Sequence, residues 1–265
     1  MKLKTITLLS LVLTFSISAF GQTTTTVKPQ PALKPAEAKP ATAVKLPTVK
    51  EILDKYVVAI GGRAANERIK TRTMKGTIEL APMGIKGTVE SFAAAPGKSY
   101  TKMNLQGIGE IVEGYDGTTA WTINPIQGNR DKTGDELLQM RLLSAFNREI
   151  DLGKHYSKME VSGADKLNDR DVYVVIATPG VAALAPETFY FDKQTGLLLR
   201  SDGVSITPEG KMPYQTYFED MREIDGVKQP YKTRVVLPQF EINTFITEVK
   251  HNVPVEDAKF AKPKQ

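Results

Sequence analysis

The chain alternates apolar and polar residues at every second position over long segments after residue 70. In residues 71–80 (TRTMKGTIEL), Met74, Ile78 and Leu80 fall on one face, and polar residues occupy the other. Residues 98–105 (KSYTKMNL) continue the pattern. A period of two residues predicts strands of an antiparallel sheet that has one buried face and one solvent-exposed face.

More strands are predicted between residues 172 and 250, where turn sequences separate apolar segments. Residues 187–192 and 197–202 flank a Lys-Gln-Thr-Gly loop, and Asp225-Gly226 separates two longer alternating segments. An Asp-Gly pair at such a position predicts a tight hairpin in which both central residues have positive φ. In total, the pattern predicts about nine to eleven strands.

Two stretches have helical periodicity instead. The first begins at Thr48, which can form a capping box with Glu51, and it ends at Gly61-Gly62. The second covers residues 135–146 (DELLQMRLLSAF), which are apolar around most of the helix circumference. Such a helix packs into a core in most proteins, but it can also cover a cavity on the concave side of a wide sheet. The pattern leaves both interpretations open.

These elements place the fold in the α+β class, with strands in the majority. We expect one antiparallel sheet, covered by two or three helices, within a single domain of residues 48–265. This length allows a large core, and the sequence shows no fixed-period repeat and no second linker that would divide it.

The first 21 residues have the three parts of a secretory signal peptide. Lys2 and Lys4 precede a 16-residue apolar segment, residues 5–20, and small residues surround the expected cleavage site at Gly21-Gln22. The apolar segment is shorter than the roughly 20 residues of a transmembrane helix, so cleavage is favoured over a permanent membrane anchor. We therefore predict a location in the periplasm or outside the cell, with no transmembrane segment after the signal is removed.

Residues 22–47 have the composition of a disordered linker. They are rich in Pro, Ala, Lys and Thr, with five prolines and no aromatic residue. Such a segment cannot bury enough apolar surface to offset the entropy lost on ordering. We expect an extended spacer, which either only sets a distance or also reaches a partner in the cell envelope.

The net charge of +5 does not indicate nucleic-acid binding. Six of the 35 Lys and Arg residues, but only one of the 30 Asp and Glu residues, precede Thr48, so 29 of each sign follow. A nucleic-acid-binding domain carries an excess of positive charge on its folded surface. We therefore expect no nucleic-acid partner.

The residues that form most catalytic and metal sites are scarce. The chain has no cysteine, which excludes disulfides, thiolate chemistry and a lipid anchor on an N-terminal cysteine. His155 and His251 are the two histidines, and neither lies in a metal-binding or Ser-His-Asp motif. We expect no cofactor, no metal and no enzymatic activity, and a hydrolase with an unrecognised site is the least favoured hypothesis.

Apolar residues are therefore the best candidates for a binding site. Trp121, the only tryptophan, follows a tight turn at Asp116-Gly117 and predicts either a core anchor or a wall of a ligand cavity. The other candidates come from the alternating strands and the second helix: Met74, Ile78, Met103, Leu105, Leu137, Leu138, Met140, Leu142 and Phe146.

Several short segments together match one known group of proteins. They are AIGG (59–62) followed by RTMKG (72–76), Tyr115-Asp116-Gly117 with Trp121, FYFDKQTGLLLR (189–200), EDMREIDG (219–226) and VPVEDAKF (253–260). In this order and spacing, over about residues 50–262, they resemble the LolA-like group of exported bacterial domains, often called outer-membrane lipoprotein-sorting proteins.

The resemblance implies a strongly curved antiparallel sheet, or half-barrel, that is covered by helices and encloses an apolar cavity for lipid chains. The true carriers of this group move acylated lipoproteins across the periplasm. The chain departs from them in its length and its Pro-rich linker, and no residue can be matched to the carriers' functional arginine.

Two hypotheses of function follow. The first is a periplasmic binding or carrier protein for the acyl chains of lipids or lipoproteins, so that its partner is a lipid or an acylated lipoprotein. The second is a non-enzymatic structural or sensing module of the envelope, in which the same sheet binds a protein partner. Apolar material retained through purification favours the first hypothesis, and an empty protein that captures an envelope partner favours the second.

Overall fold

The structure is a computed structural model that describes residues 45–263. The predicted signal peptide and nearly all of the predicted linker fall in residues 1–44, outside the described part of the chain. Among the described residues, no helix has both the length and the hydrophobicity that crossing a membrane requires.

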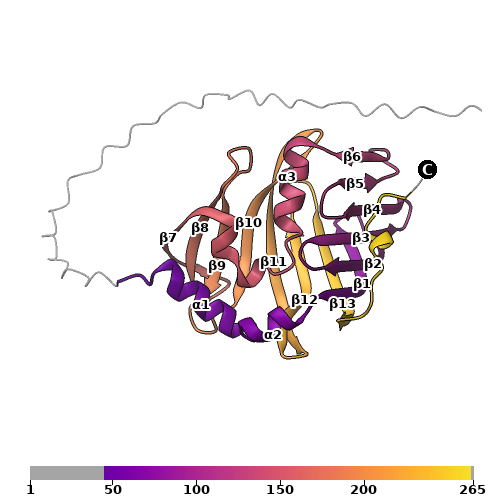
Figure 1. Ribbon diagram of the computed structural model, residues 1–265. Helices are drawn as coiled ribbons and strands as arrows, with labels where there is room; N and C mark the ends of the chain where they lie inside the picture. Colours follow the sequence, from indigo (N-terminus) through magenta and orange to yellow (C-terminus); the bar gives the residue numbers. More distant parts are fainter. Residues whose placement is uncertain (1–44, 264–265) are drawn as a thin grey trace, which may run out of the picture. The chain divides into compact units, whose positions relative to one another are not determined.

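The described residues form one sheet of 13 strands, in the order β6-β5-β4-β3-β2-β1-β13-β12-β11-β10-β9-β8-β7 (Figure 1). The strands are β1 Thr71–Ala81, β2 Ile85–Ala94, β3 Lys98–Leu105, β4 Gly109–Tyr115, β5 Ala120–Ile123, β6 Arg130–Lys132, β7 Tyr156–Leu167, β8 Arg170–Pro179, β9 Glu187–Asp192, β10 Leu198–Thr207, β11 Gly210–Ile224, β12 Val227–Val236 and β13 Glu241–His251. All neighbouring strands are antiparallel, which confirms the predicted mostly-β class.

A single long-range strand pair joins the two halves of the sheet. Every other neighbour in the sheet is also adjacent in sequence, whereas β1 pairs with β13 from Arg72↔His251 to Ala81↔Glu241. The register shifts once, between Lys75 and Gly76. Strands β1 to β6 therefore follow one another from the middle of the sheet to one edge. Strands β7 to β13 follow one another from the opposite edge back to the middle, where β13 pairs with β1.

The sheet has 13 strands rather than the predicted nine to eleven. The composition of the two edge strands explains why the sequence pattern does not reveal every strand. The edge strand β6 is three residues long and fully polar (RDK), and the other edge strand, β7, carries many charged residues (YSKMEVSGADKL). Edge strands pair on one side only and tolerate polar residues that discourage further pairing, so they lack the apolar alternation of inner strands.

Within residues 45–263, four α-helices and two short 3₁₀ helices accompany the sheet. They are α1 Val49–Ala59, α2 Arg63–Arg68, α3 Gly134–Leu143, α4 Leu152–His155, η1 Arg148–Ile150 and η2 Asp257–Lys259. The predicted capping box of α1 is present, since Thr48 N donates to Glu51 Oε2 at 2.7 Å and Glu51 N donates to Thr48 Oγ1 at 3.3 Å. The predicted second helix is shorter than expected, because it ends at Leu143 and Phe146 lies outside it.

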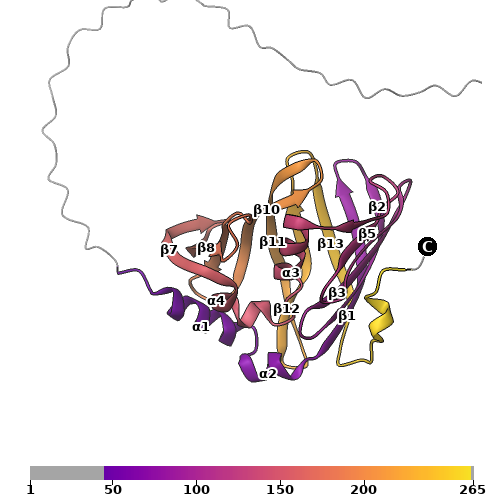
Figure 2. The same ribbon diagram turned by 45° about the horizontal axis from the view of Figure 1, so that its top comes forward.

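The sheet curves around α1, α3 and α4, which lie on its concave side (Figure 2). Ile52 and Tyr56 of helix α1, with the C-cap residue Ile60, pack against the strands of one half. Their partners include Val175, Ala177, Phe189, Phe191 and Leu198 on β8, β9 and β10. This apolar cluster holds α1 against one half of the curved sheet.

The chain changes direction between α1 and α2, at residues 60–62, which we call the α1–α2 corner. The hairpin between β11 and β12 fixes this corner. Asp225 and Gly226 have φ of 53° and 78°, which confirms the positive φ predicted for both turn residues. Gly61, at φ 107°, lies so close to this turn that a Cβ atom would be 2.0 Å from Gly226 O. Lys228 N also donates to Ile60 O at 3.0 Å, so the end of α1 is attached to the start of β12.

Candidate functional site

The strand register brings apolar residues from distant segments onto the concave face. Met74 lies opposite Ser91, and Ser91 lies opposite Thr101; two residues along, Val89 lies opposite Met103. Ile78 and Leu105 both lie opposite Gly87. Because side chains two residues apart on a strand share a face, Met74, Ile78, Met103 and Leu105 all point to the same side of the sheet.

A cavity of about 430 Å³ lies between this face and the α1–α2 corner. We call it the α1 cavity. Its apolar wall is contributed by α1, α4 and seven strands, through Tyr56, Ile60, Met74, Val89, Leu152, Phe189, Leu198, Phe218, Met221, Val227 and Ile246. The volume lies within the range of roughly 300–1,000 Å³ that is typical of small-molecule sites, and such sites are mostly apolar.

The candidate residues from the sequence occupy several places in the structure. Met74 lines the α1 cavity. Ile78, Met103 and Leu105 lie farther along the same face in a separate apolar cluster with Leu80. Phe146 is buried against Ile69 and Val227.

The candidates on α3 lie outside the α1 cavity. Leu138 and Leu142 line a second cavity of about 430 Å³, which is more open and also contains Tyr115 and Leu184. Met140 lines a smaller, polar hollow of about 200 Å³, and Leu137 is half-buried without lining any of these spaces. No side chain of α3 is fully buried, although the helix is apolar around much of its circumference.

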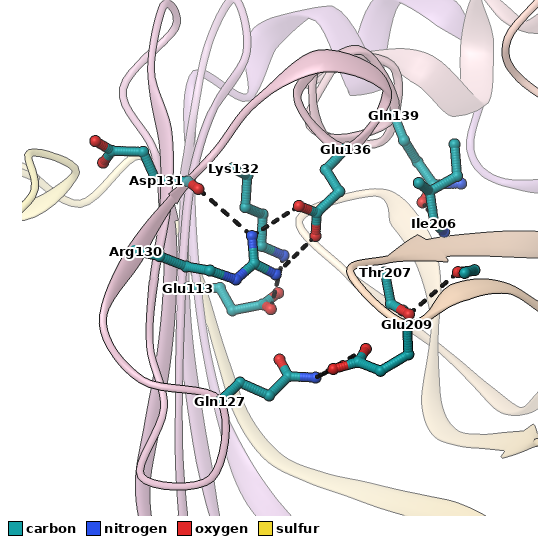
Figure 3. A network of polar contacts seen from close by, with 11 residues as sticks. Glu113, Gln127, Arg130, Asp131, Lys132, Glu136, Gln139, Ile206, Thr207 and Glu209 are labelled. Carbon is teal, nitrogen blue, oxygen red and sulfur yellow. Dashed lines mark hydrogen bonds and ion pairs between the residues drawn. The ribbon is translucent and has the colours of Figure 1, made fainter.

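Polar contacts hold α3 in place over the sheet (Figure 3). Glu136 accepts two hydrogen bonds from the Arg130 guanidinium, at 2.7 and 2.8 Å. The Gln139 side chain bonds to β10, donating to Val204 O at 2.7 Å and accepting from Ile206 N at 2.9 Å. These contacts link α3 to β6 on one side and to β10 on the other, in addition to the packing of the half-buried Leu142 against the apolar cluster under α1.

Trp121 lies on the opposite, convex face of the sheet. Four residues lie opposite one another on neighbouring strands: Phe92, Tyr100, Gly114 and Trp121. They are offset by one residue from the positions that share a face with Met74 and Met103, so they belong to the other face of the sheet. Trp121 is fully buried, and its Nε1 donates to Phe260 O at 3.0 Å. The C-terminal segment thus covers Trp121, and the tryptophan anchors the convex side.

One buried polar network borders the α1 cavity. Glu187 accepts hydrogen bonds from Arg148 Nη2 at 2.8 Å and from the Tyr156 hydroxyl at 2.7 Å, and Arg148 Nη2 also bonds to the Tyr156 hydroxyl. Burial alone would lower the pKa of Arg148, but Glu187 and Tyr156 raise it, while burial raises the pKa of Tyr156. Arg148 therefore stays charged and is neutralised by Glu187.

The cavity wall also contains polar residues that the sequence pattern did not single out. Arg72 and Gln229 line the α1 cavity, on β1 and β12 respectively. The alternation in residues 71–80 places Arg72 on the same face of the strand as Met74, so the sequence already indicated that Arg72 faces the concave side. Gln229 could not be placed from the sequence, because its segment (VKQPYKT) has no apolar alternation around it. Within residues 45–263, no group of three or more metal-ligating side chains is present.

Comparison with known proteins gives matches by structure and not by sequence. The sequence matches no protein-family model and no curated protein. A DUF1329 family protein from Desulfovibrio piger superposes with a TM-score of 0.55 at 17% identity, covering 80% of this chain and 97% of that protein. A LolA superfamily protein from Nitrosomonas europaea superposes with a TM-score of 0.54 at 14% identity, covering 82% of this chain and 99% of that protein.

A third structure agrees with these two. A putative outer membrane lipoprotein-sorting protein domain from Vibrio parahaemolyticus has a TM-score of 0.52 at 12% identity, covering 74% of this chain and 92% of that domain. The chain has a LolA-like fold. At these identities the similarity concerns the LolA-like fold alone, and the residues of the α1 cavity have to be interpreted from their own chemistry.

Proposed function

We propose that the protein binds an acyl chain of a lipid or lipoprotein in the α1 cavity and acts as a carrier or binding protein of the bacterial envelope. The observation that carries the proposal is the apolar cavity itself, about 430 Å³ in volume, between α1 and the concave face of the sheet. An acyl chain bound there removes apolar surface of both the chain and the protein from water. This burial favours binding by about 25 cal/mol per Å² of apolar surface. The signal-peptide pattern of the first 21 residues supports a site of action outside the cytoplasm.

The proposal gains support from the way the cavity is built. Its walls come from strands on both sides of the long-range β1–β13 pair and from a helix that a capping box and a buried cluster hold in place. Walls fixed in this way need little ordering when a ligand binds, so little free energy is lost to ordering. The matched structures are described as LolA superfamily and lipoprotein-sorting proteins, which agrees with a lipid ligand.

A charge placed in the cavity wall is expected to abolish uptake of an apolar probe. In Val89→Asp, a carboxylate replaces an isopropyl group that lines the cavity, opposite Met103. We expect the affinity for the uncharged fluorophore N-phenyl-1-naphthylamine to fall at least about tenfold, equivalent to about 1.4 kcal/mol, because the probe cannot hydrate the carboxylate. Fluorescence titration of the purified protein measures this change.

The neighbouring residue gives a matched control. Thr88 lies on the same strand but is exposed on the other side of the sheet, opposite Thr77 and Asn104. Thr88→Asp adds the same charge and should leave probe binding within about twofold of the wild type. Equal loss in both variants, or no uptake by the wild-type protein, would contradict the proposal, and capture of an envelope protein by an empty chain would favour the partner-binding hypothesis.

A further inference from the structure

The wall of the α1 cavity contains a positive charge that has no counter-ion. Arg72 lines the cavity, and its Nε atom is buried without a hydrogen-bond partner. Arg72 as a whole is half-buried. Within residues 45–263, its guanidinium has no carboxylate within 4.0 Å, and it lies by the ring of Phe146, with 5.5 Å between the guanidinium carbon and the ring centroid. A cation in an apolar cavity is unfavourable unless it is paired.

The charged groups around Arg72 do not compensate it. Arg148, the other arginine of the cavity wall, is already neutralised by Glu187 at 2.8 Å. Glu149 also belongs to the wall, but it is exposed and makes no ion pair with Arg72. Lys228, a half-buried residue of the same wall, adds a second positive charge and therefore cannot compensate Arg72. His251 lies opposite Arg72 on β13 and is bonded to Asp225 at 3.0 Å; its burial, and then the positive charge of Arg72, lower its pKa, so it stays neutral at pH 7.

A second donor in the same wall also lacks a partner. Gln229 is 7% exposed, and its Nε2 atom has no hydrogen-bond partner among the described residues. An unsatisfied buried amide is unfavourable, so native proteins rarely retain one without a reason. The cavity thus combines an apolar wall with two cations, Arg72 and Lys228, that have no ion pair among the described residues, and one unpaired neutral donor.

We propose that the α1 cavity binds an amphiphile with an anionic head, in which a carboxylate or phosphate pairs with Arg72, Gln229 donates to the polar part of the ligand, and the acyl chain lies against Met74, Val89 and Ile246. This inference rests on the proposed function and narrows the ligand class from acyl chains in general to those that end in an anionic oxygen group. A charge-assisted hydrogen bond from Arg72 satisfies the cation and discriminates against uncharged analogues of the same chain length.

Competition against N-phenyl-1-naphthylamine tests the head group separately from the chain. Four competitors are compared on the purified protein: dodecanoate, dodecyl phosphate, the uncharged dodecanol, and inorganic phosphate. We expect dodecanoate or dodecyl phosphate to displace the fluorophore at concentrations at least about tenfold below dodecanol, and inorganic phosphate to be ineffective. The first two competitors distinguish a carboxylate head from a phosphate head.

Substitution of Arg72 should remove the preference for the charged head. In Arg72→Gln the concentrations of dodecanoate and dodecanol needed for displacement should come within about threefold of each other, whereas Arg72→Lys should keep part of the preference. Arg68→Gln is the matched control, because Arg68 is exposed on α2 and is not part of the cavity wall. The urea midpoint of Arg72→Gln without ligand should equal or exceed that of the wild type, since a half-buried charge without a counter-ion is removed.

The outcomes separate the two levels of the proposal. If the wild-type protein binds the fluorophore but responds equally to dodecanoate, dodecyl phosphate and dodecanol, the anionic-head inference is wrong and the acyl-chain function stands. Retention of the full preference in Arg72→Gln, or displacement by inorganic phosphate alone, would also overturn it. If the wild-type protein binds neither the fluorophore nor any competitor, the proposed function itself fails.

Discussion

Gly61→Ala should destabilise the protein by about 4 kcal/mol or more. A loss of this size is rare for a single substitution and requires a specific structural cause. A Cβ atom at this position would lie 2.0 Å from Gly226 O and 3.0 Å from Gly226 C, and both are backbone atoms that cannot move aside without distorting the β11–β12 turn. The φ of 107° is also unfavourable for any residue with a side chain. Urea unfolding followed by circular dichroism measures the change.

Gly84→Ala separates the two causes. Gly84 has φ of 68° in the turn between β1 and β2, but nothing lies within 4 Å of the Cβ position. Only the left-handed backbone is then strained, so the expected loss is about 1–2 kcal/mol. If both variants lose the same amount, the close contact between the α1–α2 corner and the β11–β12 hairpin is not as the structure has it. Because Ile60 and Val227 line the α1 cavity on either side of this contact, Gly61→Ala should also lower probe uptake.

Glu187→Leu should destabilise the protein by about 3–5 kcal/mol, because it leaves Arg148 charged and buried without its partner. The Arg148 and Glu187 side chains are 17% and 10% exposed, and the nearest other acceptor for Arg148 is the Tyr156 hydroxyl, which carries no charge. The measurement is again the free energy of unfolding in urea.

The double variant Arg148→Met with Glu187→Leu provides the control. Replacing both charges with apolar side chains removes the desolvation penalty together with the ion pair, so the loss should be well below the sum of the two single variants. Additive losses would mean that the two side chains do not interact in the folded protein. This result also bears on ligand binding, since an Arg148 neutralised by Glu187 leaves Arg72, together with Lys228, as the cations of the wall available to an anionic head.

The sequence pattern predicted the regular parts of the fold because local rules determine them. The Asp225-Gly226 turn has the positive φ values that the Asp-Gly pair implies, and α1 begins with the capping box of Thr48 and Glu51. The strand predicted over residues 98–105 has the same bounds in the structure. The edge strands β6 and β7 were missed because they bury little and carry charged residues.

The α1 cavity, the proposed binding site, was harder to predict, because it depends on contacts between residues far apart in sequence. Met74 was found because its strand alternates, but Phe218, Met221 and Ile246 join it only through the pairing of β1 with β13 and of β12 with β11. Trp121 shows the limit of residue type as a signal. Its turn and its aromatic ring favoured a core anchor but were also compatible with a cavity wall, and only the strand register reveals that it lies on the convex face.

Native mass spectrometry of the protein, purified without detergent and then incubated with dodecanoate, tests the central claim most directly. We expect one bound acyl chain per protein molecule, either retained from the cells or taken up from the added dodecanoate. The adduct should be absent from Val89→Asp and present in Thr88→Asp, whose added charge faces away from the α1 cavity. A wild-type spectrum with the mass of the protein alone, both as purified and after incubation, would contradict the claim that this cavity holds an acyl chain.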